Sequence, residues 1–409
     1  MPLTRRQTYR RRRITVFSTL AVVLAGLVYG VSTGVAPLPE ATAVVAEPVT
    51  MTQPAVEPDW PEFGRGAIGA LGFPGVLSAS GDQSAVPIAS ITKMITALVI
   101  LEKYPLAAGE AGPKIEFTDA DVDIYYDVLA ENGSVAPVVA GMVLTQREAF
   151  EGMLLPSANN YALSLAVWAF GSEEAYLQAA EAWLAARGLT ATTVADTSGL
   201  SPNSVSTPAE LVEIGKLVVG TPALAEIVAM PRADLPTVGM VTNTNKMLGE
   251  LGVDGIKTGT TDEAGACLLF SSDVTVGSQS VTIVGVALGG DTHAELDRGI
   301  ATLLESMKPG FHEVTLTEAG TAFADYTTEW GEGARAVAAE AASVLVWSDT
   351  PITGVATATP VDSATEGEKV GSVDFTVGEK TVTVPLALDT ALTDPGLGWR
   401  LTHPGELAG

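Results

Sequence analysis

Hydrophobic periodicity predicts a block of helices in the first half of the chain. Apolar residues recur at helical spacing in five stretches: 89–105, 147–156, 159–171, 173–188 and 207–220. The first of these is apolar on more than one face, which predicts a helix buried in a core. Thr207, Pro208 and Glu210 supply an N-cap, a first-turn proline and a third-position acid for the last stretch.

Short apolar runs typical of strands flank this helical block. They lie at 67–81 before it and at 253–260, 266–274 and 279–290 after it, followed by a helical pattern at 297–307. Strands on both sides of a helical block predict an α/β (α+β) domain with helices packed on one sheet, which we place at 59–309. From 310 to 409 the pattern alternates as strands do, with a turn at Gly378-Glu379, and predicts a small all-β domain.

An uncharged stretch near the N-terminus is long enough to cross a membrane. Residues 14–36 carry no charge, and a helix needs about 20 apolar residues to span a bilayer. Six arginines in residues 1–13 and acids from Glu40 onward place the basic segment in the cytoplasm. We interpret the stretch as a transmembrane anchor; a signal peptide cleaved after the ATA at 41–43 is the alternative. The body is then outside the cytoplasm, on a single-pass anchor or secreted.

Composition excludes some classes of function. The net charge is −26, and six of the 22 basic residues lie in 1–13, so the body is strongly acidic and is predicted to bind no nucleic acid. The single cysteine, Cys267, forms no intrachain disulfide and has the apolar neighbours of a core residue. Residues 37–58 are rich in Pro, Ala, Thr and Glu without a period, which predicts a flexible linker.

The scarcity of histidine limits the chemistry available to a serine nucleophile. The three histidines are His293, His312 and His403, and none accompanies a G-x-S-x-G elbow, so a Ser-His-Asp triad has little support. So few His and Cys residues also argue against a zinc site. We expect neither a metal nor a cofactor.

A serine and a lysine three residues apart begin the predicted buried helix. Ser90 and Lys93 lie on one helix face, and Lys93 alone among the nine lysines has a serine three positions before it. Burial lowers the pKa of a lysine, so that its amine can act as a base for a serine hydroxyl. Taken by itself the pair is weak evidence for catalysis, because a serine in this place is more often an N-cap and a lysine more often a surface residue.

A second motif, S-x-N, follows the buried helix. Ser157 and Asn159 stand at the end of an apolar helix, where a hydroxyl can relay a proton and an amide can hold a substrate backbone. Ser201 and Asn203 form the same pattern in a turn-rich loop. We favour Ser157, because a core helix positions it.

A third motif, K-T-G, lies on a predicted strand. Lys257 offers a fixed positive charge, and the hydroxyls of Thr258 and Thr260 can bind a carboxylate. Gly259 removes a side chain where a substrate lies along the strand edge.

The order S-x-x-K, S-x-N, K-T-G resembles that of the penicillin-recognising serine enzymes, which include penicillin-binding proteins and serine β-lactamases. The surrounding stretches 88–102, 152–166, 196–211, 241–248 and 254–272 are similar to those of low-molecular-mass D-alanyl-D-alanine carboxypeptidases, and so are 306–314 and 367–388, at the start of the β domain and inside it. The resemblance extends from about Ala67 to Leu392. It implies a β-lactamase-like catalytic domain followed by a small β domain.

The resemblance implies a role for each motif residue. Ser90 attacks the bond between two D-alanines of a peptidoglycan stem peptide and forms an acyl-enzyme, with Lys93 as its base. Ser157 and Asn159 assist and position. β-Lactams, which mimic the D-alanyl-D-alanine end, acylate the same serine.

The resemblance also implies how the substrate is held. Lys257, Thr258 and Thr260 bind its terminal carboxylate, and the backbone N–H groups of Ser90 and Thr260 form the oxyanion hole. Relatives often have an aromatic residue or histidine in place of Thr260. Many also carry an arginine on the following strand, whereas here no arginine lies between Arg232 and Arg298.

Three alternatives to a carboxypeptidase remain at this point. A β-lactamase calls for an E-x-x-L-N pattern after the S-x-N, and none occurs between Ser157 and Lys257. A D,D-endopeptidase acting on peptidoglycan cross-links uses the same residues. A non-catalytic wall-binding scaffold needs none of them. The sequence names no protein partner, and the β domain is interpreted as a spacer or as a docking module.

Overall fold

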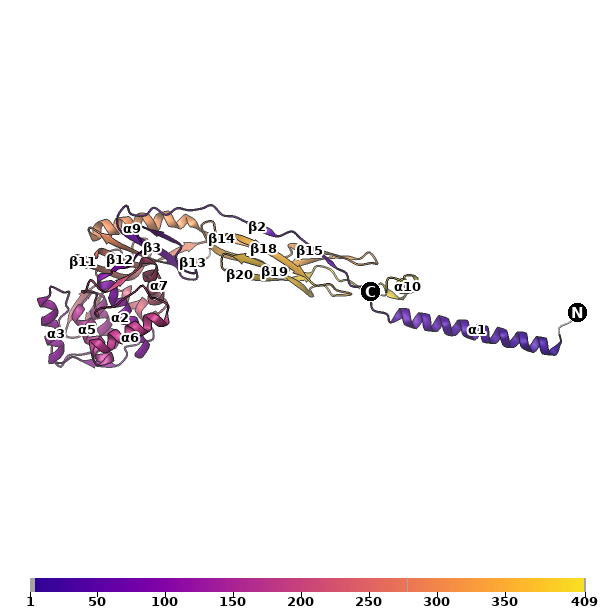
Figure 1. The fold of residues 1–409 in the computed structure, drawn as a ribbon, viewed down its shortest axis with the longest axis horizontal. Helices are drawn as coiled ribbons and strands as arrows, with labels where there is room; N and C mark the ends of the chain where they lie inside the picture. The colour runs from indigo at the N-terminus through magenta and orange to yellow at the C-terminus, as the bar shows by residue number, and fades with distance from the viewer. Residues whose placement is uncertain (1–3, 278, 408–409) are drawn as a thin grey trace. The chain divides into compact units, whose positions relative to one another are not determined.

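The structure, a computed structural model, describes residues 4–277 and 279–407 and divides into two compact units. One unit is Ala55–His312, and the other combines the N-terminal segment through Pro54 with the chain from Glu313 onward. Figure 1 shows the helices and the sheet of the first unit, and the long strands of the second. Each unit has its own buried apolar core.

An antiparallel sheet of five strands is the centre of the first unit. Its order is β11 (Val253–Thr261), β12 (Gly265–Val276), β13 (Gln279–Gly290), β3 (Arg65–Ala70) and β4 (Ser78–Ser80). Helix α7 (Pro208–Val219) packs on β13 and β3, and α9 (His293–Met307) packs on β12 and β13, on the other side of the sheet in Figure 1. Covered on both faces, the middle of β13 is buried without alternation. The predicted α/β arrangement is confirmed.

The predicted helical block is present beside this sheet. It contains α2 (Thr92–Lys103), α4 (Gln146–Leu154), α5 (Asn159–Phe170) and α6 (Glu173–Ala186), together with α7; the short helix α8 (Pro222–Val228) that follows was not predicted. Every residue of α2 from Thr92 to Leu101 is buried, as its apolar pattern predicts. Thr207 caps α7 by accepting a hydrogen bond from the Glu210 N–H at 3.2 Å.

The sequence pattern did not predict α3 (Asp119–Ala130). None of its residues is buried, so it lacks the continuous apolar stripe by which a core helix is recognised. Six further short strands accompany the helical block: β5 (Val86–Pro87), β6 (Lys114–Glu116), β7 (Val143–Thr145), β8 (Val205–Ser206) and the two strands of the β9–β10 hairpin (Arg232–Leu235, Gly239–Thr242).

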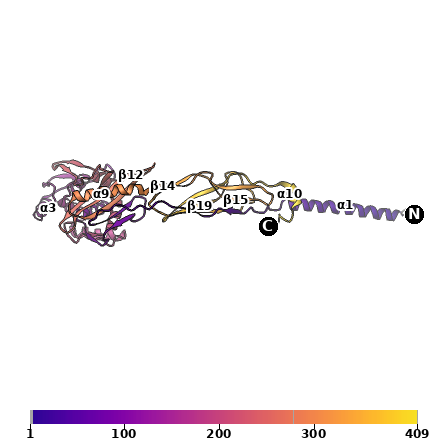
Figure 2. The same cartoon turned by 90° about the horizontal axis from the view of Figure 1, so that it is seen from above.

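The second unit is built on an antiparallel sheet of seven strands. Its order is β1 (Ala43–Val45), β15 (Ala322–Thr327), β16 (Gly333–Ala338), β20 (Lys380–Leu388), β19 (Lys369–Val377), β18 (Ile352–Ala358) and β2 (Val49–Met51). The strands β14 (Phe311–Thr317) and β17 (Ala342–Trp347) form a separate pair. Figure 2 shows β15 and β19 in this sheet from above. The predicted all-β character of this part of the chain is confirmed.

The prediction of a flexible linker over 37–58 is wrong for its middle part. Strand β1 pairs with β15, and β2 pairs with β18, so residues 43–45 and 49–51 form the two edges of the seven-stranded sheet. Ala41 before them is 3% exposed. Three-residue strands leave no periodic signal, and their partners come more than 270 residues later in the chain, beyond the reach of local pattern.

Helix α1 (Arg5–Gly34) is long and apolar enough to cross a membrane, with a mean hydropathy of 2.2 over its most apolar window. That window has no residue buried inside the protein. The C-terminal end of α1 contacts the short helix α10 (Gly396–Thr402), which lies beside it in Figures 1 and 2. The Tyr29 hydroxyl donates to the Leu401 carbonyl at 2.8 Å, and Arg400 donates to the Ala36 carbonyl.

A chain truncated to begin at residue 55 should have a less stable β unit than one that begins at residue 37. The shorter chain loses the backbone hydrogen bonds of β1 and β2 and leaves β15 and β18 as open edges. We expect its β unit to unfold at a temperature lower by roughly 5 °C or more, as measured by calorimetry. Identical transitions in the two chains would contradict the pairing of these strands.

Candidate active site

Ser90 lies in a single 3-10 turn that leads directly into α2. The turn covers Ala89–Ile91, and Ala89 adopts a φ of +45°, a conformation uncommon outside glycine. The turn is held in place because the Ile88 N–H donates to the Ser204 carbonyl. Ser90 is half-buried, and its hydroxyl oxygen lies 2.9 Å from the amine of Lys93.

The amine of Lys93 is fully buried among neutral oxygen atoms. Its Nζ lies 2.7 Å from Asn159 Oδ1, 3.1 Å from the Ser198 carbonyl, 2.9 Å from Ser90 Oγ and 3.5 Å from Ser157 Oγ. Burial, together with the positive charge of Lys257, lowers the pKa of Lys93 well below the usual lysine value, while Asp196 acts in the opposite direction. A neutral amine has two N–H groups and one lone pair. If the N–H groups serve Asn159 and Ser198, the lone pair is left for the Ser90 hydroxyl.

The S-x-N motif joins α4 to α5 beside this amine. Ser157 has a φ of +64° and is buried, and Asn159 is the first residue of α5. The backbone N–H of Asn159 donates to the Ser134 carbonyl at 2.8 Å, which anchors the start of the helix. Ser201 of the competing S-x-N pattern lies in the loop after Ser198, where its hydroxyl accepts from the Asn203 N–H.

The loop at 196–204 has a part in the site that the motif search missed. Asp196 accepts hydrogen bonds from the N–H groups of Gly199, Leu200 and Ser201 at 2.7–2.9 Å. These bonds fix the loop that presents the Ser198 carbonyl to Lys93. An Asp followed by Ser and Gly is a turn signal, but which carbonyl the turn presents depends on tertiary packing.

Gly199 is required where this loop meets the nucleophile. It has a φ of +79°, and a Cβ added to it would lie 1.8 Å from the Ala89 carbonyl oxygen. The loop backbone therefore packs directly against the residue before Ser90.

The K-T-G motif lies on β11, at the edge of the sheet beside the Ser90 turn. A Cβ on Gly259 would lie 3.1 Å from the Ala89 Cβ and 3.2 Å from the Ser90 nitrogen, so glycine permits the close approach of strand and nucleophile. This approach brings the strand backbone next to the N–H of Ser90. The hydroxyls of Thr258 and Thr260 share one face of the strand, two residues apart.

Lys257 is fully buried, and its Nζ donates to the Thr258 carbonyl at 3.1 Å. Burial lowers the pKa of Lys257 to about 7. The sequence led us to expect a fixed positive charge on Lys257. With a pKa of about 7, the amine is instead only partly protonated at neutral pH in the ligand-free site. A bound anion favours its protonated form.

Two residues outside the three motifs contact the K-T-G threonines. The Thr244 hydroxyl lies 2.5 Å from that of Thr258, and His293 Nε2 lies 2.7 Å from that of Thr260. Thr244 belongs to the stretch before β11, and His293 begins α9. Thr244 lies in the stretch 241–248 that resembles the family, but neither its contact nor that of His293 could be predicted from the sequence, because both residues reach the strand through the fold.

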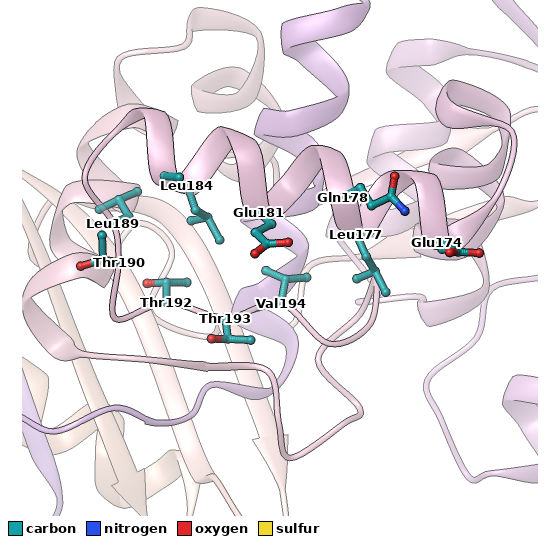
Figure 3. Close-up of a pocket in the computed structure, with 11 residues that line it drawn as sticks. Glu174, Leu177, Gln178, Glu181, Leu184, Leu189, Thr190, Thr192, Thr193 and Val194 are labelled. Carbon is teal, nitrogen blue, oxygen red and sulfur yellow. The ribbon is translucent and has the colours of Figure 1, made fainter.

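Cavity size does not identify this site. A pocket of about 520 Å³ lies between α6 and the segment 189–194, and Glu174, Leu177, Glu181 and Leu184 of α6 line it (Figure 3). It is lined by none of the motif residues. A smaller hollow of about 260 Å³ borders Asn159 and the loop at 196–200, next to Lys93.

Known proteins match this chain over the unit that holds the site. The peptidase S11 family model, D-alanyl-D-alanine carboxypeptidase, matches residues 74–292. A D-alanyl-D-alanine endopeptidase of Pseudomonas aeruginosa is 29% identical over 228 residues, covering 53% of this chain and 69% of that protein. The D-alanyl-D-alanine carboxypeptidase DacC of Escherichia coli is 27% identical over 230 residues, covering 53% of this chain and 54% of that protein, about half its length.

Solved structures share the fold. A peptidoglycan synthesis regulatory factor from Streptococcus pneumoniae matches with a TM-score of 0.60 and 21% identity over 82% of this chain and 100% of that one. Penicillin binding protein 5 from Haemophilus influenzae matches with a TM-score of 0.56 and 18% identity over 84% and 100%.

The fold is that of the penicillin-binding proteins, as the motif order predicts. The family model covers more than half of the chain. The chain therefore belongs to the D-alanyl-D-alanine carboxypeptidase family, peptidase S11, and is a low-molecular-mass penicillin-binding protein.

Replacement of Gly199 by alanine should damage the site through the backbone of Ala89. Gly199→Ala forces a Cβ against the Ala89 carbonyl, so the Ser90 turn must shift. We expect the rate of acylation by a fluorescent penicillin to fall at least about tenfold, as a displaced nucleophile loses its alignment.

Gly188→Ala is the matched control. Gly188 has a similar φ of +72°, with no atom within 4 Å of an added Cβ. This variant should cost only about 1–2 kcal/mol of stability through backbone strain and leave acylation unchanged. Equal acylation rates in the two variants would refute the role of the loop contact.

Proposed function

We propose that the protein is a serine D-alanyl-D-alanine carboxypeptidase that removes the terminal D-alanine from peptidoglycan stem peptides. The observation that carries this proposal is the buried Lys93 amine, which joins Ser90 of the first motif to Ser157 and Asn159 of the second. A nucleophile in contact with a base of lowered pKa is the arrangement that covalent acyl transfer requires.

In the acylation step, Lys93 Nζ takes the proton of the Ser90 hydroxyl as Oγ attacks the carbonyl carbon of the penultimate D-alanine. The N–H groups of Ser90 and Thr260 donate to the oxyanion that forms. The C–N bond then breaks, and the leaving amine of D-alanine takes the proton back from Lys93, directly or through Ser157. Asn159 holds the substrate backbone.

In the deacylation step, a water molecule gives a proton to Lys93 and attacks the ester carbon. The bond to Ser90 Oγ breaks, and the serine recovers its proton from Lys93. The shortened peptide leaves with a new carboxylate. β-Lactams acylate the same Ser90 oxygen; when the ring C–N bond breaks, the amine takes the proton from Lys93 but stays attached to the acyl group, so no leaving group diffuses away.

A carboxypeptidase differs from an endopeptidase in the group that follows the scissile bond. Lys257 and the hydroxyls of Thr258 and Thr260 line the strand beside the nucleophile, where they suit the carboxylate of a terminal D-alanine. Gly259 leaves the strand edge open to that residue.

A D,D-endopeptidase acting on cross-links is the second candidate. Lys257 titrates near pH 7, and no arginine lies between Arg232 and Arg298, so the cationic charge offered to a carboxylate is modest. The relative from Pseudomonas aeruginosa, named an endopeptidase, adds support for this candidate.

We further propose that α1 anchors the protein in the cell membrane, with the catalytic unit and the β-sheet of the other unit outside the cytoplasm. The helix is apolar and unburied, and its basic residues precede the apolar part. A signal peptide can have the same length and apolar composition. The mass of the chain isolated from cell membranes separates the two, because cleavage after 41–43 removes the helix.

Release of D-alanine from a peptide that ends in Lys-D-Ala-D-Ala is the test of the proposed reaction. The parent should release it and Ser90→Ala should not, as the variant lacks the attacking oxygen. Release from cross-linked peptidoglycan fragments but not from the linear peptide would replace the carboxypeptidase with the endopeptidase.

Lys93→Ala should abolish labelling by penicillin while the chain stays folded. The variant removes the proposed base but keeps Ser90, and a loss of about 10²-fold or more is expected from a missing general base. Lys114→Ala, at an exposed lysine on β6, is the matched control and should label like the parent. Normal labelling of Lys93→Ala would rule out Lys93 as the base.

A further inference from the structure

His293 is the one charged or titratable residue outside the three motifs that directly contacts a K-T-G side chain, among those whose hydrogen bonds the structure describes. It is the first residue of α9, whose N-cap is Thr292. Its Nε2 lies 2.7 Å from the Thr260 hydroxyl, and the imidazole is half-buried. None of the reaction steps above uses it.

Hydrogen-bond accounting assigns the proton between these two groups. The Thr260 hydroxyl has one hydrogen and donates it to the Gly259 carbonyl at 2.8 Å. His293 Nε2 must then carry a hydrogen and donate to Thr260. When the Thr260 hydroxyl turns to donate to a carboxylate, the imidazole still donates to its oxygen and holds its direction.

The surroundings of His293 set its charge. The pKa of His293 is lowered, mainly by burial and to a smaller extent by the positive charge of Lys257 on β11. Asp297, one turn further along α9, acts in the opposite direction. Glu250, from the turn before β11, acts on Asp297. The imidazole is therefore neutral in the ligand-free site at neutral pH, and a carboxylate that binds beside it favours the imidazolium.

We propose that His293 is a positioning residue for the terminal carboxylate of the substrate: it orients the Thr260 hydroxyl and, when a carboxylate binds, takes up a proton to give that anion a second positive charge beside Lys257. The inference rests on the proposed carboxypeptidase function, because it needs a free carboxylate at Thr260. The protonated imidazole would supply a positive charge in a site where no arginine lies between Arg232 and Arg298 to provide one. It also gives the site a preference for free over amidated chain ends.

The test is the pH dependence of KM and kcat for D-alanine release, from about pH 5.5 to about pH 8, where histidine titrates. In the parent, KM should be lowest at acidic pH and rise as the imidazole loses its proton. His293→Gln can still donate to Thr260 but cannot become charged. Its KM should be about tenfold higher than that of the parent at the acid end and equal at the alkaline end, with kcat nearly unchanged.

His403→Gln, a histidine of the other unit, is the matched control and should follow the parent profile. Asp297→Asn tests the charge of His293 in a second way, without changing the imidazole itself. It removes the charge that raises the pKa of His293, so the rise in KM should move to lower pH.

Identical KM profiles in the parent and His293→Gln would overturn the inference. If that variant fails to fold, as judged by its thermal transition, an unshifted profile in Asp297→Asn overturns it instead. Penicillin labelling of the parent separates this failure from that of the proposed function. If the parent is labelled by penicillin and releases D-alanine, the proposed carboxypeptidase function stands even when the KM profiles contradict the role of His293.

Discussion

The site depends on an amine that is buried without an ion-pair partner among the residues that the structure describes. A charged ammonium at this depth would cost several kcal/mol in lost hydration, and the four hydrogen-bond partners of Lys93 are neutral oxygens. Lys257 makes the charged form less favourable still. The structure therefore favours a neutral amine 2.9 Å from a serine hydroxyl, which is the state a general base must have before the reaction starts.

The fold keeps that amine buried by bringing four separate segments to it. Helix α2 carries Lys93 in the core, the α4–α5 junction supplies Ser157 and Asn159, and the loop at 196–204 supplies the Ser198 carbonyl. Strand β11 closes the remaining side through Gly259. Gly199 lies where the loop approaches the nucleophile backbone more closely than a Cβ allows, and Gly259 lies where the strand approaches it so closely that a Cβ would be in tight contact.

The sequence predicted those parts of the site that a local pattern encodes. Ser90 and Lys93 share a helix face, the apolar spacing of α2 showed its burial, and Lys257 to Thr260 lie on a strand. It could not predict the Ser198 carbonyl, Thr244 or His293, because their contacts join segments that only tertiary structure brings together. The edge strands β1 and β2 were missed for the same reason. The sequence also led us to expect a permanent positive charge on Lys257, whereas burial lowers the pKa of this amine to about 7. The pKa of an amine depends on its surroundings in the fold, which the sequence does not display.

The state of the Lys93 amine is the central claim, and its titration tests it most directly. The chain can be labelled with ¹³C at lysine Cε, and the Lys93 signal assigned by its loss in Lys93→Ala. NMR across pH should then show Lys93 losing its proton well below the usual lysine value, with Lys114 titrating as an ordinary exposed lysine. A Lys93 signal that titrates together with that of Lys114 would contradict the account, because a protonated amine cannot serve Ser90 as a base.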